Sequence, residues 1–461
     1  MEFFKGGHVK DPNDLALLTD LYQMTMAQGY FQSRKLGPAT FSLFIRTYPP
    51  GRGYFVSAGL ADVLRYLEEF AFHSESIDYL HSTGIFADEF LDFLRGVRFT
   101  GEVWAIPEGR LFFKDEPILE IQAPIIEAQL VETFAINQIN LQTLIATKAA
   151  RCVHAAQGRS VVDFSLRRAH GIDAGLKVGR ACYIGGCAAT SNVLAGKLYG
   201  IPIVGTMAHS FVTSFENEID AFRIFVASFP DNSTLLIDTY DTVAGAAKAV
   251  KIAQEMAARG ECLQGVRIDS GDLLQLAREV RHVFDEAGFK DVKIIGSGGL
   301  DEYDLAELSR VNAPYDSYGV GTRMGVSADA PWFDMAYKLV EHNRRSVLKL
   351  STGKATSPGR KQIFRFMKGG KRLAKDVIAL REENYQGAEP LLKKVMERGK
   401  SIHSHPPLKD IRECFVEEFK HLDAGHKDIQ SPRPYPVEIS PRLKRLQEEI
   451  ERQVARTQIE N

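Results

Sequence analysis

The sequence predicts an α/β fold: an irregular, TIM-like α/β barrel with a second, smaller and mainly antiparallel domain built from N- and C-terminal segments. Between residues 128 and 329, short apolar runs recur about every 25 to 40 residues and alternate with longer helical patterns, as in successive βα units of a parallel sheet. Short alternating strand patterns flank this region on both sides. No glycine-rich dinucleotide fingerprint follows the first apolar run, so a closed or nearly closed barrel is favoured over an open doubly wound sheet.

The N-terminal region, expected to form a domain over residues 1–130, mixes helical and strand patterns. Apolar spacing predicts helices over 14–28, 60–72 and 87–94 and a strand over 41–46. Residues 99–124 alternate between apolar and polar side chains, which predicts short strands. Pro-Glu-Gly and Lys-Asp-Glu-Pro turns separate these strands.

A barrel domain is expected over residues 131–345, entered through a helix at 132–150. Its strands are expected at 160–164, 203–205, 234–237, 266–268, 293–295 and 315–320. The remaining residues, 346–461, are expected to supply strands that can complete the N-terminal unit, then a proline-rich connection and a final helix over 441–456.

The composition is that of a globular protein without an extended charged surface. Acidic and basic residues are interspersed, 59 against 57, and the formal net charge is −2, which argues against a nucleic-acid surface or a basic membrane-binding stripe. No run approaches the roughly 20 apolar residues of a membrane span, and the start of the chain has no signal-peptide core. Five scattered cysteines suggest neither a disulfide framework nor a zinc site. We therefore expect a cytoplasmic protein whose partners are small molecules.

Small, charged and hydroxyl residues follow each expected strand of the central region. The segments are DFSLRR at 163–168, GTMAHS at 205–210, DTYD at 238–241, RIDSGD at 267–272, GSGG at 296–299 and GVGTR at 319–323. Active sites of parallel barrels are built from the loops at the carboxyl ends of the strands, so we expect these segments to surround one site. Helix caps use the same residue types, but capping alone does not account for all six segments.

The last two glycine segments predict a phosphate site. Their residues are Ser297, Gly298, Gly299, Gly319, Gly321 and Thr322. Glycine lets the backbone approach an anion closely, and a following helix N-terminus supplies free N–H donors. A phosphate held by the last two strand ends is a recurrent barrel arrangement. The alternative is a pair of tight turns without a ligand.

Arg267, Asp269 and Asp272 place a cation and two carboxylates within one short segment. Carboxylates can stabilise positive charge that develops on a sugar carbon, and they can hold Mg²⁺. Asp238 could serve the same purpose. The alternative is that Asp272 caps a helix and Arg267 forms a structural ion pair.

Phe164, Arg167 and Arg168 suit a planar anion, because an aromatic face can stack on it and guanidinium groups can bind its carboxylate. Phe164 taken alone could equally belong to the core. His209, which Thr206 precedes by three residues, could act as a general base or nucleophile. Without that context it would more simply be a hydrogen-bonded structural histidine.

Together, these segments resemble the nicotinate phosphoribosyltransferase family over nearly the whole chain. The matching motifs, in order, are TDLYQMTM, DFSLRRAHG, GTMAHSF, RIDSGDL, GSGGLDEYD and YGVGTR. The resemblance implies the family's irregular α/β barrel with its smaller second domain. It also implies a homodimer with active sites at the interface, Mg²⁺ as cofactor and ATP as co-substrate.

The resemblance extends to single positions. His209 matches the histidine that ATP phosphorylates transiently, and Tyr22 matches a tyrosine that stacks on the pyridine ring, often from the partner subunit, with Phe164 on the other face. The remaining matches are Thr206 and Arg267 in the nicotinate site, Thr322 in the phosphate site, and Arg167 and Arg168 near the substrates.

Ser191 aligns where the nicotinamide-using relative has an acidic residue. An acid there would accept a hydrogen bond from an amide and repel a carboxylate, so the serine favours nicotinate. The segment RMGVSADAP at 323–331 departs from the commoner wording of the family, which leaves the local phosphate contacts open.

The resemblance implies formation of nicotinate mononucleotide and pyrophosphate from nicotinate and 5-phosphoribosyl 1-pyrophosphate, with His209, Arg267 and Asp269 as catalytic residues. One rival is a nicotinamide or quinolinate phosphoribosyltransferase of the same fold. Another is a non-catalytic phosphate-binding protein. A third, an unrelated barrel enzyme acting on a sugar phosphate, leaves His209 and Tyr22 without a role.

Overall fold

The computed structural model describes residues 12–349 and 357–459. The expectation for the start of the chain therefore lies outside the described residues, as do residues 350–356 of the expected C-terminal strands. The chain forms two compact units. The antiparallel unit contains residues 1–144, 332–428 and 432–461, and the parallel unit contains residues 145–331 and 429–431. The antiparallel unit takes the larger share of the chain rather than the smaller share expected, while the domain boundaries near residues 130 and 345 stay a prediction.

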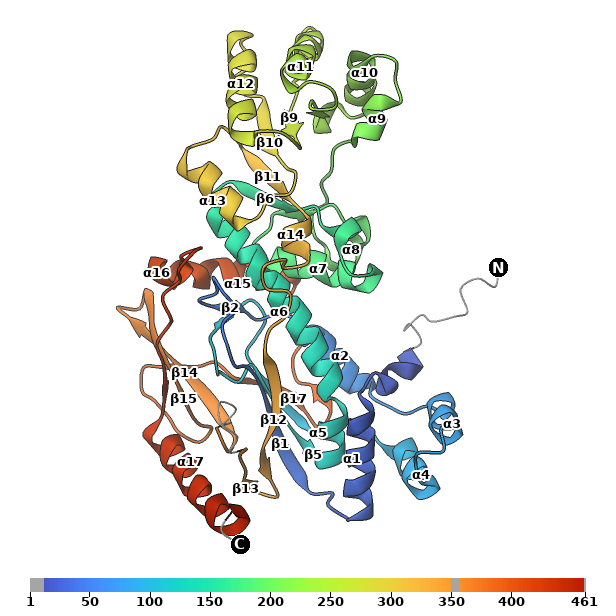
Figure 1. Cartoon of the computed structure of the whole chain (residues 1–461), viewed down its shortest axis with the longest axis vertical. Coiled ribbons are helices and arrows are strands. Elements are labelled where there is room, and N and C mark those ends of the chain that lie inside the picture. Colours follow the sequence, from blue (N-terminus) through green and yellow to red (C-terminus); the bar gives the residue numbers. More distant parts are fainter. Residues whose placement is uncertain (1–11, 350–356, 460–461) are drawn as a thin grey trace. The chain divides into compact units, whose positions relative to one another are not determined.

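A six-stranded sheet forms the centre of the parallel unit (Figure 1). Its strands are β6 (Ser160–Asp163), β7 (Ala189–Thr190), β8 (Thr234–Leu236), β9 (Gly265–Ile268), β10 (Lys293–Gly296) and β11 (Ser317–Val320). Their order is β7-β6-β11-β10-β9-β8, and every neighbouring pair is parallel. The expected α/β class with a parallel sheet is confirmed.

This sheet is a half-barrel rather than a closed barrel. In the described residues, its hydrogen-bonded ladder ends at β8 on one side and, beyond β7, at a single bridge between Thr190 and Ile203 on the other. The strand expected at 203–205 is thus reduced to one bridge, and β7 was not expected. A strand of two residues contains no apolar run by which the sequence could reveal it.

Helices connect the parallel strands. They are α6 (Glu132–Ala155), which leads in from the antiparallel unit, α7 (Ile172–Ile184), α8 (Val193–Tyr199), α9 (His209–Thr213), α10 (Glu218–Ser228), α11 (Thr242–Ala257), α12 (Leu273–Glu286), α13 (Glu302–Arg310) and α14 (Thr322–Gly325), with the 3-10 helices η2 (Leu166–Arg168) and η3 (Pro230–Asn232). The side chains of Asp241, Asp272 and Asp301 accept hydrogen bonds from first-turn N–H groups of α11, α12 and α13. These caps make the helices begin directly after the strand ends.

A seven-stranded sheet organises the antiparallel unit, in the order β13-β12-β1-β5-β3-β17-β18. The strands are β1 (Pro38–Ile45), β3 (Glu102–Ala105), β5 (Leu119–Pro124), β12 (Met335–His342), β13 (Arg345–Ser346), β17 (Lys393–Glu397) and β18 (Lys400–Ser401). Of the expected C-terminal strands, β17 pairs with β3, whereas the strand that pairs with β1 is β12, which lies in the range expected for the barrel domain. Only the first residue of β1 is exposed, because both faces of this strand contribute to the core.

The antiparallel unit also contains two smaller sheets and several helices. A four-stranded sheet contains β16 (Glu389–Pro390), β14 (Lys361–Lys368), β15 (Arg372–Leu380) and β19 (Val437–Ile439), and β2 (Phe55–Val56) pairs with β4 (Leu111–Phe112). The helices are η1 (Pro12–Leu17), α1 (Leu21–Gln32), α2 (Leu60–Glu69), α3 (Ser74–Ser82), α4 (Asp88–Gly96), α5 (Ile125–Leu130), α15 (Leu408–His421), α16 (Ala424–Lys427), α17 (Pro441–Val454) and the π-helical η4 (Ala455–Ile459). The single helix expected over 14–28 is divided into η1 and α1. The final helix begins as expected, because Ser440 caps it and Pro441 occupies its first position.

Two further expectations can be compared with the structure. In the described part of the chain, no helix combines the length and the apolar character that crossing a bilayer requires. The five cysteines are free thiols, of which Cys262 and Cys414 are exposed.

A buried ionic network lies inside the antiparallel unit. Arg365 of β14 binds Asp376 of β15 and Glu418 of α15, each at 2.6 Å. Glu116 is fully buried beside them; one of its carboxyl oxygens accepts from the Phe113 N–H at 2.8 Å, and the other has no hydrogen-bond partner among the described residues. Burial, followed by the negative charge of Asp376, raises the pKa of Glu116 well above its ordinary value, although Arg365 opposes this.

The raised pKa makes folding depend on pH at this position. Because the folded chain holds the Glu116 proton more tightly than the unfolded chain, the stabilisation is present at low pH and is lost as the pH rises toward the folded-state pKa. Glu116→Gln keeps the shape and cannot ionise. Between about pH 5 and pH 8, its free energy of unfolding in urea should decline less than that of the wild type, by about 1.4 kcal/mol for each unit of pKa shift. Parallel pH profiles of the two proteins would contradict this.

Candidate functional site

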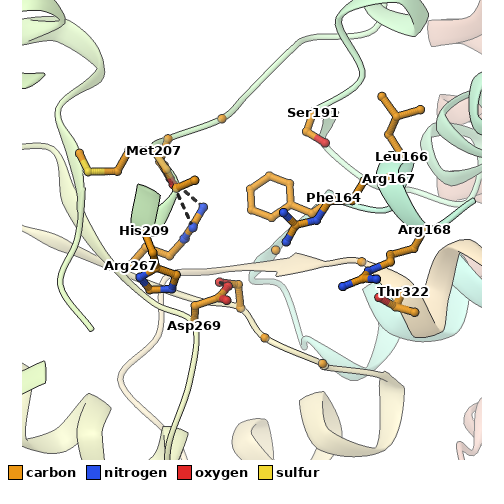
Figure 2. Close-up of a pocket in the computed structure, with 18 residues that line it drawn as sticks. Phe164, Leu166, Arg167, Arg168, Ser191, Met207, His209, Arg267, Asp269 and Thr322 are labelled. Atoms are coloured by element: carbon orange, nitrogen blue, oxygen red, sulfur yellow. Dashed lines mark hydrogen bonds between the residues drawn. The ribbon is translucent and has the colours of Figure 1, made fainter. Parts of the chain in front are cut away.

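A cavity of about 550 Å³ opens at the carboxyl ends of the parallel strands. The predicted residues that line it are Phe164, Arg167, Arg168, Ser191, Thr206, His209, Arg267, Asp269, Ser297, Gly298, Gly299, Gly319, Gly321 and Thr322. Figure 2 shows these side chains around one open space, with His209, Arg267 and Asp269 on the left and Arg168 and Thr322 on the right. The volume is that of a site for a small-molecule ligand.

Arg267 lies beside an aromatic face in this cavity. It donates to Thr206 Oγ1 at 2.7 Å and to the Met207 carbonyl at 3.1 Å, and its guanidinium carbon lies 5.9 Å from the centre of the Phe164 ring. Its buried Nε has no partner among the described residues. Burial lowers the pKa of Arg267, although the neighbouring Asp269 and Asp238 oppose this. Phe164 is only half-buried and lines the cavity, so it is not simply a core residue.

His209 is the first residue of α9 and is half-buried. Its Nδ1 lies 3.2 Å from Thr239 Oγ1, a contact that restrains the orientation of the imidazole ring. Thr239 was not predicted as a site residue, although it lies within the DTYD segment.

The three aspartates predicted for this site have different positions. Asp269 lines the cavity and accepts from the Ser297 hydroxyl at 2.5 Å. Asp238 is not among the lining residues; it accepts from the backbone N–H of Asp269 at 2.9 Å and from the Ser270 hydroxyl at 2.6 Å. Asp238 therefore holds the loop that carries Asp269.

Asp272 is exposed and does not line the cavity. Its side chain accepts from the N–H groups of Leu274 and Gln275 and caps α12. The structure thus agrees with the alternative prediction for Asp272, in which its side chain caps a helix. In the described residues, no three His, Cys, Asp or Glu side chains gather as metal ligands.

The glycine loops bring the backbone to the edge of the cavity. Gly298 has φ +96°, and a β-carbon there would come within 1.7 Å of the Asp269 carbonyl oxygen. A β-carbon on Gly319 would come within 2.4 Å of the Phe164 ring. Only glycine permits both close approaches.

The two helices after these loops differ in the N–H groups that they leave free. First-turn N–H groups of α13 are occupied by the Asp301 side chain, which forms a capping box with Asp304. At α14 no side chain caps the first turn. The expectation of free donors is therefore wrong for the first turn of α13, because the sequence GSGGLDEYD contains its own cap, and it stays a prediction at the second loop.

Tyr22 lies on α1 of the antiparallel unit and is not among the residues that line the cavity. Its side chain is half-exposed, and its hydroxyl accepts from Gln23 Nε2 at 2.7 Å. Partial burial and the charge of Glu132 raise the pKa of Tyr22 to about 12. Residues that line the cavity but were not predicted are Leu166, Gly205, Met207 and Ala208, all of them inside predicted segments.

Comparisons with known families match most of the chain. Residues 17–140 match the N-terminal domain of nicotinate phosphoribosyltransferase, residues 159–362 match the nicotinate phosphoribosyltransferase family, and residues 384–447 match its C-terminal domain.

Individual relatives agree with this match. Nicotinate phosphoribosyltransferase pncB2 of Mycobacterium tuberculosis is 47% identical, over 93% of this chain and 92% of its own length. Nicotinate phosphoribosyltransferase of Bacillus subtilis is 36% identical, over 93% of each chain. The crystal structure of human nicotinic acid phosphoribosyltransferase has a TM-score of 0.84 and 30% identity, covering 94% of this chain and 99% of that one.

The Gly298 turn provides a test of the cavity itself. Gly298→Ala places a β-carbon against the Asp269 carbonyl at a positive φ, so the loop must move. We expect affinity for 5-phosphoribosyl 1-pyrophosphate, measured by calorimetry, to fall at least tenfold, which is about 1.4 kcal/mol.

Gly288→Ala is the matched control. Gly288 also has positive φ, +87°, but a β-carbon there meets no atom within 4 Å, and it is not among the residues that line the cavity. Both variants should lose about 1 kcal/mol of stability from backbone strain. Equal affinities of the two variants would contradict a role for the Gly298 turn in binding.

Proposed function

The chain belongs to the nicotinate phosphoribosyltransferase family, and we propose that it forms nicotinate mononucleotide and pyrophosphate from nicotinate and 5-phosphoribosyl 1-pyrophosphate, a step of NAD biosynthesis. The observation that carries the proposal is the convergence of two binding features in one cavity. A flat aromatic face beside arginines lies at the ends of β6 and β9, and close-approach glycine loops lie at the ends of β10 and β11.

The cavity suits both halves of this reaction. Phe164 offers a face for the pyridine ring, while the unpartnered Nε of Arg267 and the exposed Arg167 offer donors for its carboxylate. Backbone N–H groups of the glycine loops would bind the 5-phosphate. The pyridine nitrogen then attacks the anomeric carbon as the bond to pyrophosphate breaks. Most of the rate would come from positioning the two substrates and from stabilising the charge that develops at the sugar.

Asp269 fits a magnesium ion that pyrophosphate shares. Mg²⁺ usually binds through one or two carboxylates together with substrate phosphates and water, so a complete protein cage is not needed. When bound, the ion would neutralise the leaving pyrophosphate. Asp269 lines the cavity, whereas Asp272 is exposed and occupied as a helix cap. Asp269 is therefore the carboxylate that we assign to the ion.

His209 is proposed to accept a phosphoryl group from ATP. The ring is half-buried, lines the cavity and is restrained by Thr239. A phosphoryl group transferred from ATP to an imidazole nitrogen, with release of ADP, would be hydrolysed to phosphate in each cycle. That hydrolysis would couple ATP to the synthesis of the mononucleotide.

A homodimer is part of the same proposal. Helix α1 exposes Leu21, Tyr22 and Met26, and α8 exposes Val193 and Leu194, each with at least 38% of its surface accessible. Apolar residues that are exposed together on one helix can contribute to an association surface. Tyr22 would reach a pyridine ring in the partner subunit's site. A cytoplasmic location is proposed as well, which the five free thiols support.

A substrate comparison tests the proposed function. The purified protein with 5-phosphoribosyl 1-pyrophosphate and Mg²⁺ should convert nicotinate, and convert it faster when ATP is present. With nicotinamide or quinolinate, kcat/KM should be at least about 100-fold lower, because the serine and arginines suit a single carboxylate. Chromatography of the products provides the measurement. If no nicotinate mononucleotide forms with or without ATP, the proposed function is wrong.

Ser191 provides the matching variant for substrate choice. Because an acidic side chain repels a carboxylate and accepts from an amide, Ser191→Asp should lower kcat/KM for nicotinate about tenfold or more relative to nicotinamide. Ser191→Ala, which adds no charge, is the control. An unchanged ratio in Ser191→Asp would show that the pyridine substituent lies elsewhere.

The histidine can be tested separately from the transfer step. His209→Asn cannot form a phosphohistidine, so labelled phosphate from [γ-³²P]ATP should no longer attach to the protein, and the stimulation by ATP should disappear. Synthesis without ATP should remain detectable, because the phosphate loops and Phe164 are unchanged. His170→Asn is the control, since His170 is exposed on the loop after β6 and is not a lining residue. Full labelling of His209→Asn would exclude His209 as the acceptor.

A further inference from the structure

Asp163 is a buried carboxylate for which the proposed reaction has no direct use. It is the last residue of β6 and is 1% exposed, and it is not among the residues that line the cavity. Its neighbour along the chain is Phe164, whose ring lines the cavity.

The carboxylate of Asp163 joins two strand ends. One oxygen accepts from the Ser165 backbone N–H at 2.9 Å and from the Ser165 hydroxyl at 2.5 Å. The other oxygen accepts from the hydroxyl of Thr190, the last residue of β7, at 2.7 Å. One side chain thus fixes the turn that follows Phe164 and the end of the neighbouring strand.

Thr190 extends this junction to a third segment. The N–H of Ser191 donates to the Asp163 carbonyl at 2.8 Å, so Ser191 is held directly beside the end of β6. Thr190 also exchanges backbone hydrogen bonds with the segment at 202–204, with the Val204 N–H donating to the Thr190 carbonyl at 3.0 Å. That segment leads directly to Gly205 and Thr206 of the cavity.

Close packing leaves these groups little freedom to rearrange. Ser165 and Thr190 are completely buried. A β-carbon on Gly325 of α14 would lie 2.2 Å from the Ser165 β-carbon, and one on Gly179 of α7 would lie 3.5 Å from Thr190 Oγ1. Backbones of two helices therefore press against the junction. Burial raises the pKa of Asp163, although its three hydrogen bonds oppose this.

We propose that Asp163 and Thr190 form a positioning clamp, which sets the place of the Phe164 ring relative to the Ser191 hydroxyl and thereby selects the pyridine carboxylate. The inference rests on the proposed function, because it places the pyridine ring between the Phe164 ring and the Ser191 hydroxyl. The clamp acts on the pyridine side of the cavity. The glycine loops that would hold the 5-phosphate lie at the ends of β10 and β11, and among the described residues the Thr190 hydroxyl bonds Asp163 and Asn192 rather than these loops.

Thr190→Val tests the clamp, because valine keeps the shape and removes the hydroxyl, which donates to Asp163 and accepts from the Asn192 N–H. We expect KM for nicotinate to rise about tenfold and the preference for nicotinate over nicotinamide to fall by a similar factor, while KM for 5-phosphoribosyl 1-pyrophosphate stays within about twofold. Thr190→Ser restores the hydroxyl and should return both nicotinate values to within about twofold of the wild type.

Thr143→Val controls for the loss of a buried hydroxyl. Thr143 lies in the antiparallel unit, is completely buried and donates to the Ala58 carbonyl at 3.2 Å. Its variant should lose stability without a change in KM for nicotinate. If Thr190→Val does not fold, Thr190→Ala takes its place, since alanine also removes the hydroxyl that binds Asp163.

Hydrogen exchange provides a readout that does not depend on turnover. In Thr190→Val, the peptides that contain Ser165 and Ser191 should exchange faster, while those of the loop at Gly298 should not. The clamp is wrong if Thr190→Val has the wild-type KM for nicotinate, if both substrates' KM values rise equally, or if Thr190→Ser is as impaired as Thr190→Val. Failure of the proposed function would appear differently, as a wild-type protein that forms no nicotinate mononucleotide.

Discussion

Backbone hydrogen bonds between six short parallel strands hold the cavity together. Because the strands run in one direction, their carboxyl ends meet at one edge, and residues far apart in the chain, such as Phe164 and Thr322, line one space. In three of the five strand pairs the register places the last strand residues side by side, as with Asp163 and Thr190 or Gly296 and Ile268. A shift of one residue would turn each polar end toward the helices. The chemistry of the cavity therefore depends on the ladder.

Two carboxylates that do not line the cavity hold the loops that follow the strands. Asp238 anchors the loop of Asp269, and Asp163 anchors the turn after Phe164, in both cases through backbone N–H groups and hydroxyls. In the antiparallel unit, buried carboxylates are instead paired with a cation, because Arg365 binds both Asp376 and Glu418. Removing one partner from such a group leaves a desolvated polar atom, which costs about 1–3 kcal/mol. The buried Asp163 and Asp376 thus hold structure in place, while the half-buried Asp269 lines the cavity.

Much of this arrangement could be predicted from the sequence, because each strand end carries its polar residues in a contiguous segment. The helical and strand periods predicted the parallel sheet, and the positions of the polar segments predicted one cavity. Thr190 could not be found, because its strand has only two residues and its role depends on a neighbour in space. The half-barrel could not be foreseen either, since closure depends on pairing between β8 and the segment at Ile203 rather than on local pattern. Asp272 was assigned to metal although its N-cap signal was present.

We propose that one cavity receives the phosphate on its glycine loops and the pyridine ring on Phe164. A crystal structure with bound nicotinate mononucleotide tests it most directly, because the product contains both groups. Its phosphate oxygens should lie within hydrogen-bonding distance of backbone N–H groups of the Gly298–Gly299 and Gly321–Thr322 turns, with the pyridine ring against Phe164. A product molecule bound outside this cavity, or with its phosphate on Arg267 and its ring at the glycine loops, would contradict the account.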